Sequence, residues 1–213
     1  MHISKRKLPH IYPKGAVFFV TFRLFGSLPA HVLSEWQQNK EQALEKIKIK
    51  ELDNTEKDSL LYNEEKRFFA SYDKLLDKYS STKDYLKNPI VANTVAQKIR
   101  EFDNVLYDLE AYCIMSNHVH LLIDTQLYAE LPKYSFSKVM QYIKGGSAFL
   151  CNKELNRKGY FWEDESYDHF VRNEEEKSNI VQYILNNPIK AQLVKEIEDY
   201  PFLYSKNHST NGL

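Results

Sequence analysis

The stretch YCIMSNHVHLLID, residues 112–124, contains two histidines whose spacing suits a metal ion. Its pattern is typical of a strand, a tight turn at Ser116 and Asn117, and a second strand opening with His118 and His120. Side chains alternate between the faces of a strand, so both imidazoles point to one face. Two imidazoles in this arrangement can hold one divalent cation. The alternative is a pair of ordinary polar residues on a half-exposed strand, but the apolar run that follows and a nucleophile downstream favour the metal site.

The candidate nucleophile is Tyr183, which lies four residues before Asn187 in a segment predicted to be helical, so the two share a face. A tyrosine oxygen beside a metal can attack a phosphodiester, and the covalent phosphotyrosine conserves the energy of the broken bond for rejoining. Asn187 would add an oxygen ligand to the two imidazoles, and such a mixed set suits Mg²⁺ or Mn²⁺. The chain has 15 tyrosines, so a half-buried helix aromatic is the alternative for Tyr183.

Basic residues near such a metal could hold a phosphate backbone, and unpaired bases could stack on an aromatic ring such as Trp162. Each cation could instead be an ordinary surface or core residue, as when a strand charge extends to the sheet edge. The candidate DNA contacts are Arg23, Lys144, Arg172 and Lys190.

The elements that must position these residues follow from periodicity and from turn signals. Residues 16–24 form a strand with apolar side chains on both faces, which indicates a central strand. Asn173 and Glu176 form a capping box that begins the last long helix, and Pro188 is expected to end or kink it before helix resumes over 189–197. Helices are predicted at 30–51, 55–79, 88–102 and 135–151, and further strands at 105–115, 118–124 and 167–171. This order predicts an α+β fold, an antiparallel sheet whose histidine face is covered by the last helix.

Composition narrows the class of protein. Lys and Arg number 29, as do Asp and Glu, which argues against a generic, non-specific DNA coat but not against a localised basic face. Two isolated cysteines, Cys113 and Cys151, suggest a reduced intracellular chain. No apolar run approaches the roughly 20 residues of a membrane span, and the N-terminus lacks a secretory signal. We therefore expect a cytoplasmic protein with no membrane partner.

Three stretches, HIYPKGAVFFVTFRLFGSLP, MSNHVHLLID and YILNNPIKAQLV, together resemble the single-tyrosine HUH transposases, and most closely the REP-associated tyrosine transposases. The resemblance runs from about Leu8 to Tyr204. It implies a ferredoxin-like sheet, enlarged here by a helical insertion at about residues 30–104 within one domain of residues 1–204. The tail, residues 205–213, is expected to be disordered.

The resemblance also implies cleavage and rejoining of single-stranded DNA next to hairpins, with metal on His118, His120 and Asn187 and with Tyr183 taking the 5′ phosphate. The family usually has Pro at the position of Ser116 and Gly at that of Gln192, and neither change removes a catalytic group. Tyr167 is the second candidate nucleophile, and His169 is first of all a strand residue.

Two other functions remain open: a non-catalytic protein that binds DNA hairpins, and a metal-dependent phosphodiesterase that uses water. The sequence also leaves open whether the protein is a monomer or a homodimer.

Overall fold

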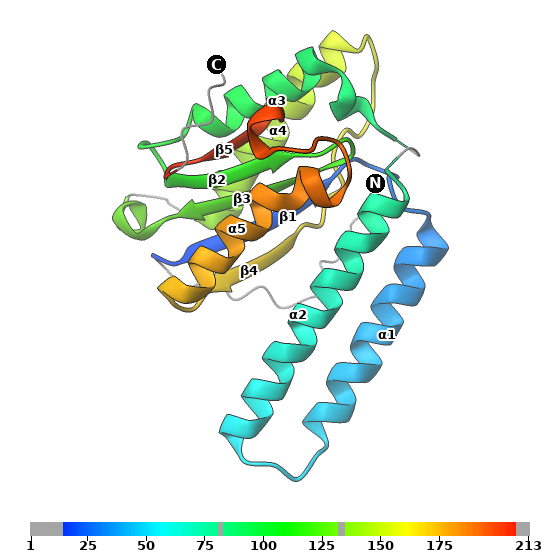
Figure 1. Cartoon of the computed structure of the whole chain (residues 1–213), viewed down its shortest axis with the longest axis vertical. Coiled ribbons are helices and arrows are strands. Elements are labelled where there is room, and N and C mark those ends of the chain that lie inside the picture. Colours follow the sequence, from blue (N-terminus) through cyan, green and yellow to red (C-terminus); the bar gives the residue numbers. More distant parts are fainter. Residues whose placement is uncertain (1–14, 81–82, 132–134, 208–213) are drawn as a thin grey trace. The chain divides into compact units, whose positions relative to one another are not determined.

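The computed structural model describes residues 15–80, 83–131 and 135–207, and these residues form two compact units. The sheet unit extends to Phe25 and resumes at Asp84, and the helical hairpin occupies residues 26–83. Figure 1 shows the sheet with its helices and, separately, the two long helices of the hairpin.

The sheet unit is built on five antiparallel strands in the order β4-β1-β3-β2-β5. They are β1 (Val17–Arg23), β2 (Asp108–Ile114), β3 (His118–Asp124), β4 (Tyr167–Val171) and β5 (Leu203–Ser205). β1 pairs with β4 on one side and β3 on the other, which explains why its sequence is apolar on both faces. The register places Thr21 opposite His120 and Arg23 opposite His118.

Helices cover both faces of this sheet. The helices α3 (Pro89–Arg100) and α4 (Phe136–Glu154) enclose the main core with the side chains of Phe18, Val20 and Phe22. The opposite face is crossed by α5 (Glu174–Lys190), which lies in front of the sheet in Figure 1. The predicted α+β class, an antiparallel sheet with helices packed on it, is confirmed.

The helix α5 begins as its sequence indicates, because the Asn173 side chain accepts a hydrogen bond from the Glu176 N–H at 2.8 Å. The prediction for its end was wrong. The helix continues through Pro188 to Lys190, and the described residues 191–196 contain no helix. Gln192 then adopts a left-handed conformation with φ 58°, which closes the helix. Proline is tolerated here because only one helical hydrogen bond this close to the C-terminus is lost.

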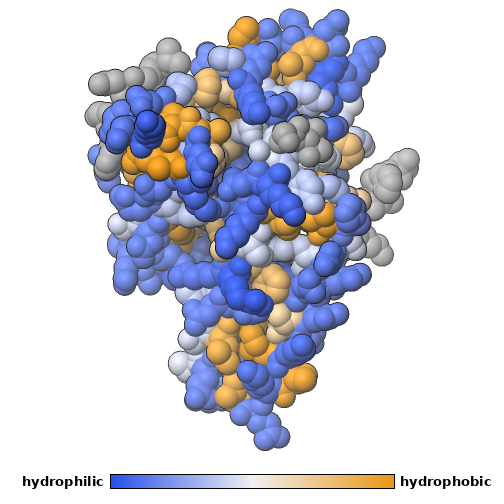
Figure 2. All heavy atoms as spheres, turned by 45° about the vertical axis from the view of Figure 1, so that its right-hand side comes forward, coloured by the Kyte–Doolittle hydropathy of each residue, from blue (hydrophilic) through white to orange (hydrophobic). Residues whose placement is uncertain are grey.

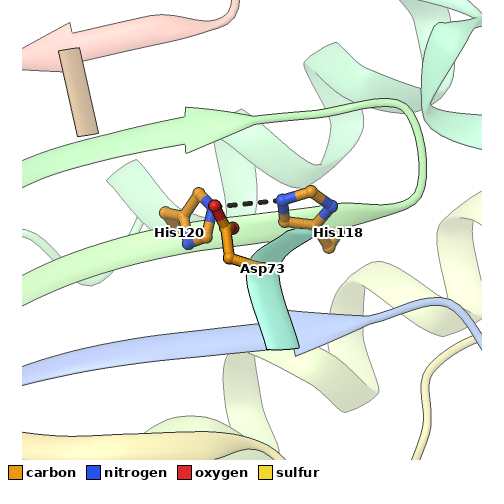
Figure 3. A group of neighbouring side chains, drawn as sticks. All are labelled: Asp73, His118 and His120. Atoms are coloured by element: carbon orange, nitrogen blue, oxygen red, sulfur yellow. Dashed lines mark hydrogen bonds between the residues drawn. The ribbon is translucent and has the colours of Figure 1, made fainter. Parts of the chain in front are cut away.

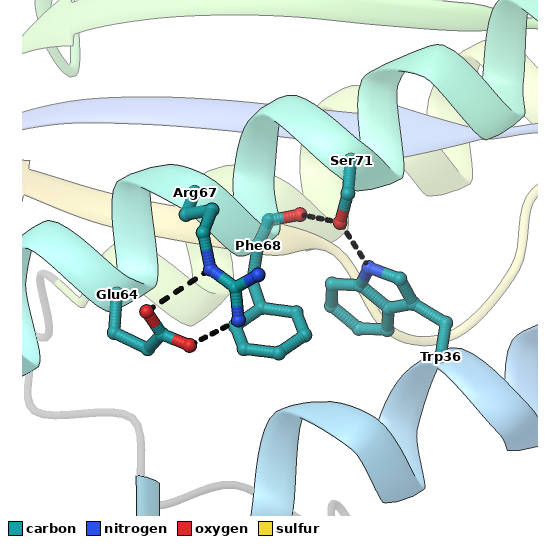
Figure 4. A network of polar contacts seen from close by, with 5 residues as sticks. All are labelled: Trp36, Glu64, Arg67, Phe68 and Ser71. Atoms are coloured by element: carbon teal, nitrogen blue, oxygen red, sulfur yellow. Dashed lines mark hydrogen bonds and ion pairs between the residues drawn. The ribbon is translucent and has the colours of Figure 1, made fainter. Parts of the chain in front are cut away.

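The helical hairpin consists of α1 (Ala30–Lys48) and α2 (Asn54–Lys78). Trp36 of α1 packs edge-on against Phe68 of α2, with ring centroids 6.0 Å apart, and its Nε1–H donates to the Ser71 hydroxyl at 2.8 Å. Figure 4 shows these contacts beside the ion pair of Arg67 with Glu64 on the same helix. Since the insertion predicted for about residues 30–104 also includes α3, only part of that range is hairpin, and the rest packs in the sheet unit.

A groove of about 870 Å³ runs along the hairpin between its two helices. Hydrophobic side chains gather over the lower part of Figure 2, where the hairpin lies. The apolar lining residues are Val32, Trp36, Ala43, Ile47, Leu60, Phe68 and Leu75.

Two further predictions concern the ends and the helices of the chain. The tail predicted for 205–213 starts with Ser205 in β5, and residues 208–213 lie outside the described residues. Within the described part of the chain, every helix is too short or too polar to cross a membrane.

Candidate active site

The two histidines of β3 face each other on the side of the sheet that α5 covers. Their Nε2 atoms are 3.0 Å apart, and the rings meet edge-on with centroids separated by 4.7 Å. Both side chains are buried, at 1% exposure for His118 and 0% for His120. Figure 3 shows the two imidazoles on β3. Asp73, also drawn there, belongs to α2 of the hairpin, and the site described below consists of residues of the sheet unit.

The Nδ1 atom of each imidazole contacts an oxygen atom. His118 Nδ1 lies 2.6 Å from the Asn117 side-chain oxygen, and His120 Nδ1 lies 2.8 Å from the Thr21 hydroxyl. Thr21 reaches its partner because β1 and β3 pair with these two residues opposite each other. Hydrogen bonds of this kind fix the orientation of metal-binding imidazoles.

The two Nε2 atoms, 3.0 Å apart, are close enough for one divalent cation to bind both. An oxygen ligand would complete a mixed nitrogen–oxygen set.

Tyr183 contacts one of the two histidines, His120, directly. Its ring lies edge-on to His120, with centroids 5.4 Å apart, and edge-on to Phe19 at 6.0 Å. The helix α5 thus brings the predicted nucleophile onto the face that carries both imidazoles. The ring contacts fix the inclination of the tyrosine side chain against the sheet.

Asn187 is one turn beyond Tyr183 and is fully buried. Its Nδ2 donates to the Tyr183 carbonyl at 3.1 Å, while its Oδ1 is buried and has no hydrogen-bond partner among the residues that the structure describes. Buried polar atoms are nearly always paired, so this amide oxygen is available to a partner beyond the described residues. A divalent cation is one group that it could bind.

The four predicted DNA contacts occupy different environments. Lys190 lies over the Tyr183 ring, with its Nζ 5.5 Å from the centroid. Arg172 is exposed, and its guanidinium lies 5.9 Å from the Phe170 ring. These two cations therefore lie on or beside the helix that presents the tyrosine.

The other two cations are engaged within the protein. Arg23 is buried and donates to Glu163 Oε1 at 3.1 Å. Lys144, on the opposite face of the sheet from the histidines, donates to the Asp164 carbonyl at 2.9 Å and to Ser166 Oγ at 3.1 Å. It lines a groove of about 620 Å³ that also has acidic walls.

The secondary candidates Tyr167, His169 and Trp162 also make defined contacts. Tyr167 pairs with Thr21 and so lies on the histidine face of β4. His169 contacts Glu176 Oε1 at 3.0 Å, which ties β4 to the start of α5. Trp162 is only 5% exposed and donates to Ser147 Oγ at 2.9 Å, so stacking of DNA bases on this ring is contradicted.

Thr21 and Asn117 are the site residues that sequence reasoning missed. Asn117 was a visible candidate because it immediately precedes His118. Thr21 lies 99 residues from its partner, and only the pairing of β1 with β3 brings them together. Its signal was a polar residue within the apolar strand VFFVTFR.

Known proteins with similar sequences include two curated transposases. A REP-associated tyrosine transposase of Escherichia coli is 26% identical over 109 residues, covering 50% of this chain and 59% of that protein. A Haemophilus influenzae protein, named as a candidate REP-associated tyrosine transposase, is 25% identical over 126 residues, covering 57% of this chain and 71% of its own.

A solved structure of a REP-associated tyrosine transposase bound to a REP hairpin is 17% identical to the chain. It covers 93% of this chain and 82% of its own, with a TM-score of 0.49. The family model described as "Transposase IS200 like" matches residues 78–187, which run from the end of α2 to Asn187 and include both histidines and Tyr183. Because that match covers more than half of the 213 residues, the chain belongs to the family of IS200-like transposases.

Proposed function

We propose that this transposase cleaves and rejoins single-stranded DNA next to hairpins, through a 5′-phosphotyrosine intermediate on Tyr183. The observation that carries the proposal is the meeting of His118, His120 and Tyr183 on one sheet face, with the Tyr183 and His120 rings 5.4 Å apart. The curated relatives support it, because both are named as REP-associated tyrosine transposases.

In the proposed step, the Tyr183 hydroxyl oxygen attacks the scissile phosphorus and a new oxygen–phosphorus bond forms. The bond from phosphorus to the 3′ oxygen breaks, the phenol proton passes to water, and the departing 3′ oxygen takes up a proton. Attack by a 3′ hydroxyl of another strand end on the phosphotyrosine reverses the step and joins the DNA. No external energy is needed because one phosphodiester bond is exchanged for another.

His118, His120 and Asn187 would hold the divalent cation, Mg²⁺ or Mn²⁺. When bound, the cation polarises the phosphate and offsets the negative charge that develops during attack. The remaining work falls to the chain itself: Phe19 and His120 orient the Tyr183 ring, and the Asn187 amide adds a hydrogen bond to the Tyr183 carbonyl.

Among the cations, Lys190 is the best placed to hold a phosphate, since it lies 5.5 Å from the Tyr183 ring. We propose Arg172 as a second contact, from the exposed start of the same helix. Arg23 and Lys144 would contact DNA only by exchanging Glu163, or Asp164 and Ser166, for a phosphate. Charge reversal at Lys190 should therefore weaken DNA binding more than charge reversal at Lys144, in a filter-binding assay at fixed salt.

The function can be tested by mixing the protein with end-labelled single-stranded hairpin DNA and Mn²⁺ or Mg²⁺, followed by a denaturing gel. Wild type should give a protein–DNA adduct that survives denaturation, whereas Tyr183→Phe and His118→Ala should not. Tyr167→Phe is the matched control, because Tyr167 lies on the same sheet face, and it should still form the adduct.

Other results would assign the reaction differently. An adduct that is lost in Tyr167→Phe but kept in Tyr183→Phe would move the nucleophile to β4. Cleavage without any adduct would indicate a phosphodiesterase that uses water. A mobility shift without cleavage, across several hairpins and both metals, would leave a non-catalytic DNA-hairpin-binding protein.

A further inference from the structure

We infer that Thr21 and Asn117 are positioning residues, which stabilise the tautomer of each imidazole that presents the Nε2 lone pair to a bound cation. The inference rests on the metal site of the proposed function, and it concerns how tightly that site binds. Both side chains are fully buried and neither would touch the metal or the DNA phosphate. Their role would be exerted only through His118 and His120.

For His118 the argument follows from the chemistry of its neighbour. A neutral imidazole has one N–H and one nitrogen lone pair. The Asn117 side-chain oxygen, 2.6 Å from Nδ1, can only accept a hydrogen bond, so Nδ1 must be the N–H donor. The lone pair of His118 is then left at Nε2, which faces His120.

For His120 the partner is the Thr21 hydroxyl, which lies 2.8 Å from Nδ1 on the neighbouring strand. The hydroxyl can donate to Nδ1 or accept from it. Metal binding at Nε2 requires the second arrangement, in which Nδ1 carries the hydrogen and the Nε2 lone pair faces His118. The ring orientation is held by Phe19, which stacks on His120 with centroids 5.8 Å apart and planes inclined by 23°. Strand register, a hydroxyl and a ring contact thus fix one imidazole.

In the metal-free protein the two Nε2 atoms lie 3.0 Å apart, at hydrogen-bonding distance. Because Asn117 holds the His118 hydrogen at Nδ1, the hydrogen between the rings lies on His120 Nε2, and the Thr21 hydroxyl donates to His120 Nδ1. When a cation binds both Nε2 atoms, His120 carries its hydrogen at Nδ1 instead, and the Thr21 hydroxyl accepts it. Without either oxygen, the tautomer that binds metal loses its partner at Nδ1.

The test measures Mn²⁺ affinity by calorimetry at about pH 8, where unperturbed imidazoles are neutral. Thr21→Val keeps the shape of the side chain but removes the oxygen, and it should weaken binding about 10- to 100-fold, as loss of such a partner typically does. Thr21→Ser keeps the oxygen and should stay within about threefold of wild type. An unchanged Mn²⁺ affinity in Thr21→Val would overturn the inference.

A second measurement requires no metal. Imidazole ¹⁵N shifts of the metal-free wild type should show the Nδ1–H tautomer at His118, because the Asn117 oxygen can only accept. A mixture of tautomers at His118 in wild type would refute the tautomer argument.

The same comparison at Asn117 uses Asn117→Ala, which loses the acceptor, and Asn117→Asp, which keeps it. Asn117→Ala should show the mixture at His118 and weaker Mn²⁺ binding, and Asn117→Asp should show neither. This pair keeps the inference testable if Thr21→Val fails to fold.

The two proposals fail in different ways. If Mn²⁺ binds wild type and the variants weaken it as expected, but no protein forms a DNA adduct, the positioning role stands and the tyrosine chemistry is wrong. If the adduct forms in wild type while Thr21→Val binds Mn²⁺ normally, the function stands and the positioning role is wrong.

Discussion

At the scale of single residues, the site keeps polar groups in places where burial is costly. An unpaired buried oxygen costs about 1–3 kcal/mol of folding stability, and Asn187 Oδ1 has no partner among the described residues. Such a cost is expected where an atom is reserved for a ligand. Stability and metal binding should therefore respond in opposite directions when this oxygen is removed.

We expect Asn187→Leu to raise the free energy of unfolding of the metal-free protein by about 1–2 kcal/mol, since it replaces an unpaired oxygen with a methyl group. The same change should abolish the rise in melting temperature that Mn²⁺ gives wild type. Asn186→Leu is the matched control, because Asn186 makes the same type of bond to a carbonyl four residues earlier but is exposed. A destabilised Asn187→Leu protein would mean that the amide is structural.

Whether two site residues can be recognised as neighbours from the sequence depends on how close together they lie along the chain. His118 and His120 share a strand, and Tyr183 and Asn187 share a helix face, so spacing alone brings each pair together. Long-range partners are different. The ion pair of Arg23 with Glu163 spans 140 residues and the Thr21–His120 contact spans 99, so neither was visible before the strand order was known.

At the scale of elements, the end of α5 determines how the tyrosine helix leaves the sheet. The N–H of Gln192 donates to the Ile189 carbonyl, and that of Leu193 donates to the Pro188 carbonyl, both at 2.9 Å. This pattern is a Schellman motif, in which the left-handed residue is usually glycine. Gln192 fills that position at φ 58°, and its side chain is strained there because its Cβ crowds the backbone.

Gln192→Gly should therefore stabilise the protein by about 0.5–1 kcal/mol, since relief of the left-handed strain exceeds the added freedom of glycine in the unfolded chain. Urea denaturation measures the difference. Ala191→Gly, one residue earlier at an ordinary φ of −78°, should instead destabilise it. Equal effects of the two glycines would mean that the left-handed backbone carries no strain.

Most helices and strands were predicted from sequence because the hydrophobic periods and caps are local, but the short strand β5 was not. The course of the chain after Pro188 was not predicted correctly. Proline close to a helix C-terminus removes a single hydrogen bond, and the Schellman motif satisfies the last carbonyls. The only sign of the left-handed Gln192 in the sequence was the glycine that the family usually has at this position, since glutamine itself is not typical of that conformation.

At the scale of the whole molecule, the burial of a thiol and a phenol in their neutral forms makes folding stability depend on pH in the alkaline range. Burial raises the pKa of the Cys151 thiol to about 12 and that of the Tyr112 phenol to about 12, from ordinary values of 9.0 and 10.0. Both groups therefore keep their protons in the folded chain at pH values where the unfolded chain has lost them. The unfolded state binds fewer protons above pH 9, so stability should fall as pH rises from about 9 to 12.

The urea midpoint should thus be nearly the same at pH 7.5 and 8.5 and fall clearly by pH 10.5. Tyr112→Phe removes one of the two groups, so its urea midpoint should fall less over the same interval. Above pH 10 its free energy of unfolding should fall by up to about 1 kcal/mol less per pH unit than that of wild type. Each protein serves as its own reference at pH 8.5. Parallel curves for the two proteins would show that Tyr112 does not titrate with unfolding.

The domain organisation remains a proposal: one transposase domain into which the helical hairpin is inserted. The two ends of the hairpin lie within the reach of one lysine side chain, because a Cβ added at Gly26 would meet Lys83 Nζ at 3.5 Å. Since the chain enters and leaves this unit at neighbouring points, an insertion here need not interrupt the pairing of β1.

The place of β1 in the sheet has a consequence for the newly made chain. β1 leaves the ribosome well before its partners β3 and β4, which follow about 100 and 150 residues later. The hairpin makes local contacts and can fold during this interval, whereas the apolar segment VFFVTFR has no strand to pair with. Such segments promote aggregation while they are exposed. Synthesis should therefore be the stage at which this protein most needs chaperones.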